Sequence, residues 1–138
     1  MTLKSSCAVI AVDTNVVIRL LTGDDQDQAT RARELFETET IWLPKTVILE
    51  AEWVLRRLYG LAKERVAEAL TALAALPNVR CEDEAAIVQA LRWAANGLDF
   101  ADALHVASAG SAERFATFDT DLVKRASFAR TGATIMAL

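Results

Sequence analysis

The pattern of hydrophobic positions along the chain predicts strands that alternate with helices. Short apolar runs are typical of strands, and longer segments with apolar residues at helical spacing separate them. The predicted strands cover residues 7–12, 41–43, 79–81, 114–118 and 134–137. The predicted helices cover residues 16–21, 28–37, 46–59, 63–76, 84–95, 99–109 and 120–126. No hairpin turn joins neighbouring strands, so the order indicates one α/β domain over residues 1–138: a mostly parallel central sheet inside a three-layer α/β/α arrangement.

The first predicted strand leads directly into a polar cluster. Residues 7–12 are apolar or small and too few for a buried helix, so we expect a strand that is buried on both faces of a parallel sheet. Asp13, Thr14 and Asn15 follow it, and Thr14 or Asn15 can cap the next helix. Ligands of open α/β sheets bind beyond the carboxyl ends of the strands. Asp13 is therefore expected where such proteins carry their chemistry.

Three further acidic residues can reach the same edge of the sheet. Asp119 follows the fourth predicted strand, and Asp102 lies in the first turn of the helix that Asp99 caps. Glu50 lies at the edge of the apolar stripe of helix 46–59. Each acid taken alone has a structural explanation as a helix cap or a surface charge. Taken together, these side chains predict a carboxylate cluster.

The same helix carries a second acid with a simpler explanation. Glu52 lies on the polar face with Arg56 four residues later, which predicts a solvated ion pair. Glu50 has no basic residue at that spacing. Thr46 is the expected cap of this helix, which we expect to end near Gly60.

A cluster of carboxylates is the ligand set of a hard cation. Carboxylates that are held together repel one another unless they share protons or bind cations. Oxygen ligands without cysteine or histidine suit Mg²⁺, or Mn²⁺ in its place. Such ions activate a water molecule and stabilise the leaving oxygen when a phosphodiester is attacked. The pattern indicates nuclease chemistry, with Asn15 and Thr117 expected to orient the neighbouring carboxylates.

Composition and charge bear on the partners and the cellular compartment of the protein. The net charge of −4 argues against a nucleic-acid partner, but neutralising four carboxylates with cations brings the balance to zero. Cys7 and Cys81 form no CxxC motif, which favours reduced thiols in a cytoplasmic protein. No run is long enough for a membrane span. The hydrophobic fraction of 53% is high enough to suggest that a partner or a second copy covers part of the surface.

The remaining candidate residues each have a functional and a structural explanation. His105, the only histidine, lies one turn after Asp102 and is either a base or a packed residue. The tryptophans have apolar neighbours, so we expect core or interface positions rather than base stacking; they are Trp42, Trp53 and Trp93. Several basic residues are either contacts to an RNA backbone or solvated charges; they are Lys45, Arg56, Arg57, Lys124 and Arg125.

Four motifs together resemble a known family. VDTNVVIRLL, VILEAEWVLRR, LDFADALHVASA and ATFDTDL resemble the PIN-domain family, particularly its VapC-type toxin ribonucleases, over nearly the whole chain. The resemblance implies a Mg²⁺- or Mn²⁺-dependent endoribonuclease that hydrolyses RNA. It maps the catalytic and metal-binding acids onto Asp13, Glu50, Asp102 and Asp119, with Asp99 as a further ligand or a cap. It also implies a homodimer that a cognate antitoxin protein inhibits.

Other functions fit the acids less well. A receiver-like phosphoacceptor needs an acidic residue after a middle strand, where this chain has Trp42, Leu43 and Pro44. A haloacid-dehalogenase-type phosphatase needs a second aspartate at position 15, which is Asn15. A non-catalytic module that binds RNA or protein, and a PIN nuclease of RNA processing that is not a toxin, stay open as alternatives.

Overall fold

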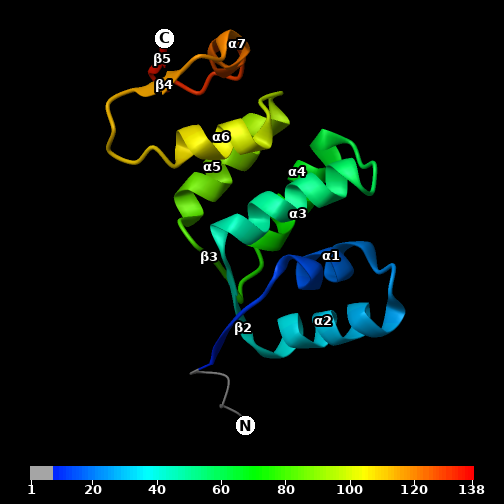
Figure 1. Ribbon diagram of the computed structural model, residues 1–138. Coiled ribbons are helices and arrows are strands. Elements are labelled where there is room, and N and C mark those ends of the chain that lie inside the picture. Colours follow the sequence, from blue (N-terminus) through cyan, green and yellow to red (C-terminus); the bar gives the residue numbers. More distant parts are fainter. Residues whose placement is uncertain (1–7) are drawn as a thin grey trace.

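The computed structural model describes residues 8–138 and confirms the predicted order of elements (Figure 1). Cys7, the first residue of the predicted opening strand, lies outside the described residues. The elements are β1 (Val9–Ala11), α1 (Thr14–Thr22), α2 (Gln26–Thr38), β2 (Thr40–Leu43), α3 (Lys45–Arg57), α4 (Lys63–Ala74), β3 (Val79–Cys81), α5 (Glu84–Ala95), α6 (Phe100–Ala107), β4 (Phe115–Thr117), α7 (Thr120–Phe128) and β5 (Ile135–Ala137). None of the helices described for residues 8–138 is long and apolar enough to cross a bilayer.

All strand pairs of the described chain are parallel, as predicted for an α/β fold, but they lie in two sheets. The first sheet has the order β1-β2-β3, with Ile10 opposite Ile41 and Trp42 opposite Arg80. The second sheet contains β4 and β5. In Figure 1 the unit of β4, α7 and β5 lies at the end of the molecule opposite the N terminus. The central parallel sheet and its covering helices agree with the predicted three-layer α/β/α arrangement.

The expectation that the first strand is buried on both faces is wrong. Val9 is 53% exposed and Ala11 is also exposed. Val9 and Ala11 point to the same face of the sheet, so this face of β1 meets solvent; in the described residues β1 is also the edge strand of its sheet and pairs only with β2. The central strand β2 instead carries the buried positions, because Ile41 and Leu43 have no exposed surface.

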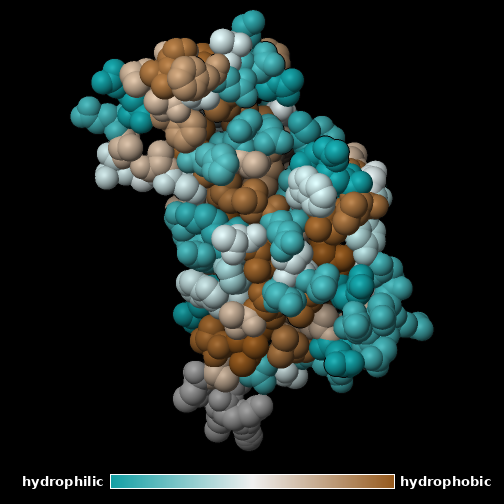
Figure 2. Space-filling model, viewed as in Figure 1, coloured by the Kyte–Doolittle hydropathy of each residue, from teal (hydrophilic) through white to brown (hydrophobic). Residues whose placement is uncertain are grey.

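One hydrophobic core joins the first sheet to the helices. α3 supplies Ile48, Ala51 and Leu55, which are almost fully buried in this core, and α3 packs against α1, α4 and α6. α5 packs along both α4 and α6. Figure 2 shows apolar residues at several separate places on one face of the molecule, and in the C-terminal unit Phe118 and Phe128 are exposed. These surfaces agree with the high hydrophobic fraction of the sequence.

Acidic side chains begin most of the helices that carry candidate residues. Asp13 caps α1, although the sequence favoured Thr14 or Asn15 for this role, and Asp99 and Asp119 cap α6 and α7. A carboxylate that accepts hydrogen bonds from the free backbone N–H groups of the first turn also favours the helix dipole. α3 begins after Pro44 with no side-chain cap, so the predicted cap by Thr46 is wrong.

The expectation that Glu52 is solvated is wrong. Glu52 is only 3% exposed and is the one buried charged residue of the described chain, although the ion pair with Arg56 is present at 2.9 Å as predicted. Of the tryptophans, which were expected at core or interface positions, Trp93 is buried, whereas Trp42 and Trp53 are 37% and 47% exposed. An interface position for Trp42 and Trp53 stays a prediction.

Candidate active site

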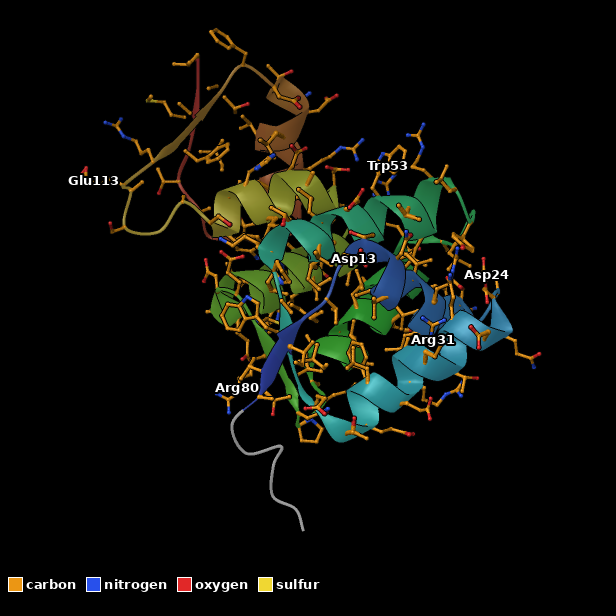
Figure 3. All side chains as sticks on the ribbon, turned by 60° about the horizontal axis from the view of Figure 1, so that its bottom comes forward. Asp13, Asp24, Arg31, Trp53, Arg80 and Glu113 are labelled. Carbon is orange, nitrogen blue, oxygen red and sulfur yellow. The ribbon has the colours of Figure 1, made fainter. Side chains whose placement is uncertain are left out.

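Asp13 and Glu50 lie close together at the carboxyl end of β1. Asp13 stands where β1 joins α1, beside α3 (Figure 3), and its carboxylate accepts a hydrogen bond from the backbone N–H of Val16 at 3.2 Å. The next residue, Thr14, donates from Oγ1 to Oε1 of Glu50 at 2.5 Å. This contact brings the third helix to the start of the first one. The side chains of Asp13 and Glu50 are both exposed and reachable by a ligand.

A second acidic group lies between α6 and α7. The Oδ2 atom of Asp99 accepts a hydrogen bond from the backbone N–H of Asp102 at 3.1 Å. Burial raises the pKa of the Asp102 carboxyl, and the negative charges of Asp99 and Asp119 raise it further, while His105 and Arg125 oppose the effect. These effects require the three carboxylates to lie within electrostatic range of one another.

The carboxylate of Asp119 also holds the start of α7. Its Oδ1 atom accepts hydrogen bonds from the backbone N–H groups of Asp121 at 2.9 Å and Leu122 at 3.2 Å. Thr117 accepts a hydrogen bond from the backbone N–H of Asp119 at 3.0 Å through its Oγ1 atom. Thr117 therefore holds the turn that carries the acid through the backbone, and its predicted orienting contact with the carboxylate stays a prediction.

The helices that carry Glu50 and Asp102 pack against each other. α3 packs against α6, and Glu50 lines a cavity together with Ala101, the residue before Asp102. Even so, residues 8–138 contain no group of three or more acidic, histidine or cysteine side chains placed to hold a metal ion. The donor type, carboxylates that repel one another, fits a hard cation. The structure brings these donors together in neighbouring groups and not in one closed site.

The other predicted candidates are placed as follows. Asn15 is exposed and lines a cavity of about 320 Å³ with Arg19 and Arg31, and in the described residues it makes no hydrogen bond to Asp13. His105 is exposed near Asp102, so it is not a packed core residue. Lys45 forms an ion pair with Asp83 at 2.9 Å. Trp53, for which the sequence predicted a core or interface position, lies three residues after Glu50 on one helix face and lines the same cavity as Glu50, with its side chain half exposed.

The chain is similar to one known protein family. The PIN domain family matches residues 10–128, from β1 to the end of α7. No curated protein matches the chain. The matched range includes every candidate acid and covers most of the chain.

Proposed function

The chain belongs to the PIN domain family, and on that premise we propose that it is a Mg²⁺-dependent endoribonuclease that hydrolyses phosphodiester bonds in RNA. Membership supports a hydrolase of the nuclease class. The observation that carries the proposal is that a match over residues 10–128 includes acids at the ends of β1 and β4 and on α3 and α6. Mn²⁺ can take the place of Mg²⁺, because both ions prefer oxygen ligands.

Both acidic groups contribute ligands to the proposed site. Asp102 and Asp119, with Asp99 either as a ligand or as the cap of α6, supply carboxylates whose mutual repulsion a cation relieves. Asp13 and Glu50 supply the other carboxylates, and Thr14 orients Glu50. A bound divalent ion supplies an activated water molecule and stabilises charge on the leaving oxygen. Thr117 acts on the backbone of Asp119 and so positions that acid.

The test is cleavage of RNA by the purified full chain. Cleavage of total RNA is expected with Mg²⁺ and not with a chelator, and the Asp13→Asn and Asp102→Asn variants are each expected to lose at least about a hundredfold in rate. Asp27→Asn is the matched control, because Asp27 is an exposed acid of α2 that pairs with Arg31. Cleavage that survives chelation, or full activity in both acid variants, refutes the mechanism.

We further propose the role of a toxin in a type II toxin–antitoxin pair. The chain would act as a homodimer that a cognate antitoxin protein inhibits, and its exposed apolar residues are compatible with both contacts. Expression of the chain in a bacterial host is expected to stop growth, and Asp102→Asn is expected to restore it. Normal growth with active, soluble protein would instead favour a PIN nuclease of RNA processing.

The alternative is a non-catalytic module that binds RNA or protein. It receives support from the separation of the candidate acids into two groups. Binding of RNA that is never cleaved, with any divalent ion, is the result that would establish it. The cleavage assay above distinguishes the two functions directly.

A further inference from the structure

A cavity between α3 and α6 lies beside the candidate acids and is not explained by the chemistry proposed above. Its volume is about 290 Å³, and its walls come from α3 and from Ala101 of α6. Apolar surface dominates these walls, contributed by Leu49, Trp53 and Ala101. Glu50 lies at the same cavity, and Asp102 directly follows Ala101. The cavity therefore has Glu50 in its wall and borders the helix that carries Asp102.

Trp53 supplies a partly exposed aromatic wall. Its side chain projects from α3 on the side away from α1 and α2 (Figure 3) and is 47% exposed. Ile48 and Leu55 of α3 are buried and its other large aliphatic side chains are partly buried against the core, so the exposed indole of Trp53 is an exception on this helix. A flat apolar surface that is held on a helix is well suited to stacking against another flat ring.

Two charged residues give the cavity a fixed polar side. Glu52 is 3% exposed, and its Oε2 and Oε1 atoms accept hydrogen bonds from Nε and Nη2 of Arg56 at 2.9 and 3.4 Å. These two bonds hold the guanidinium in place. The Nη1 group of Arg56 makes no hydrogen bond in the part of the chain that the structure describes, so its donors are available to a ligand.

We propose that this cavity binds one nucleobase of the RNA, stacked on Trp53 and hydrogen-bonded at its edge by Arg56. The inference rests on the proposed function, since it names how the substrate is held beside the acids. A flat heterocycle matches apolar walls with a few convergent polar groups. A phosphate does not match them, because two carboxylates, Glu50 and Glu52, outnumber the one guanidinium. Any base can stack on an aromatic side chain, and the hydrogen bond from Arg56 to the edge of the base adds a preference among bases.

The test measures base binding without metal, so it is independent of cleavage. The three indole N–H signals of the full ¹⁵N-labelled chain are followed by NMR in the presence of a chelator, with adenosine or uridine monophosphate added up to about 10 mM. A saturable shift of the Trp53 signal is expected with the nucleotides and not with ribose 5-phosphate, which has no base. Trp42 is the matched control, because it is 37% exposed but lies on β2 and outside the cavity.

Substitutions then separate stacking from folding. Because the Trp53 variants lack the indole signal, nucleotide binding to every variant is followed by the backbone amide signals of α3. Trp53→Ala is expected to weaken nucleotide binding by roughly tenfold, Trp53→Phe to retain most of it, and Trp42→Phe to leave it unchanged. An equal shift with ribose 5-phosphate, or no shift of Trp53 at all, overturns the inference. A shift caused by a leucine-rich peptide and not by nucleotides also overturns it, in favour of a protein partner. Base binding in a chain that cleaves no RNA would refute the nuclease proposal alone, and cleavage without base binding would refute this inference alone.

Discussion

The ion pair of Glu52 and Arg56 provides the sharpest test of how α3 is packed. In the Arg56→Met variant the guanidinium is lost, while the aliphatic stem and the helical preference are largely kept. Glu52, 3% exposed, is left as a buried carboxylate without its partner. Leaving a buried charge without its partner destabilises the fold by more than the ion pair stabilised it, because the folded chain keeps the carboxylate away from water.

The expected loss in the free energy of unfolding follows from the exposed fractions of the Arg56 and Glu52 side chains. Removing one partner of a buried pair costs about 3 to 5 kcal/mol. The side chain of Arg56 is 24% exposed and that of Glu52 is 4% exposed, so some water can reach the carboxylate after the substitution and the lower figure applies. We expect the free energy of unfolding to fall by about 3 kcal/mol, which lowers the melting temperature by about 10 °C for a domain of this size.

The assay is urea unfolding at neutral pH, with two comparison variants. Arg31→Met breaks an ion pair with the same spacing of four residues and an N–O distance of 3.0 Å, but its side chains are 72% and 78% exposed. That variant is expected to lose at most about 0.5 kcal/mol. The double variant Glu52→Gln/Arg56→Met removes the buried charge as well and should regain most of the loss. If Arg56→Met and Arg31→Met are equally stable, the burial of Glu52 has been misjudged.

Other outcomes can be checked on the same protein. Ile41 has no exposed surface in the central strand, so Ile41→Ala is expected to lose about 3 kcal/mol and Ile41→Val about 1 kcal/mol in urea unfolding; equal losses would contradict a tightly packed strand. Asp25 caps α2 through the backbone N–H of Gln28 at 3.0 Å, and Asp25→Ala should lose about 1 kcal/mol, measured as a lower urea midpoint. Hydrogen bonds from Tyr59 and Thr22, and the charge of Arg19, hold the pKa of Asp24 below its ordinary value of 3.8. This contribution to stability is present above pH 3.8 and is lost as the pH falls through the lowered pKa, so the advantage of the native chain over Tyr59→Phe should be constant near neutral pH and shrink in acid, as followed by unfolding between pH 2 and 7.

The sequence by itself determined the elements and their order. Helix 84–95 and strand 79–81 were predicted with the bounds that the structure has, because a polar residue before the helix and a stop after it are local signals. The sequence likewise predicted that Asp13 and Asp119 follow strands, because an apolar run that ends at an acid is a local signal; in the structure each acid lies two residues beyond the end of its strand.

Only the tertiary structure decided which faces are buried and which strands pair. Helical spacing puts Glu52 on the polar side of α3, yet the folded chain buries it. Periodicity also predicts five strands, but it does not say that they lie in two sheets or that β1 has a free edge in the described chain. The bond from Thr14 to Glu50 spans 36 positions. Such contacts depend on which surfaces meet after folding, and a local pattern carries no information about its distant partner.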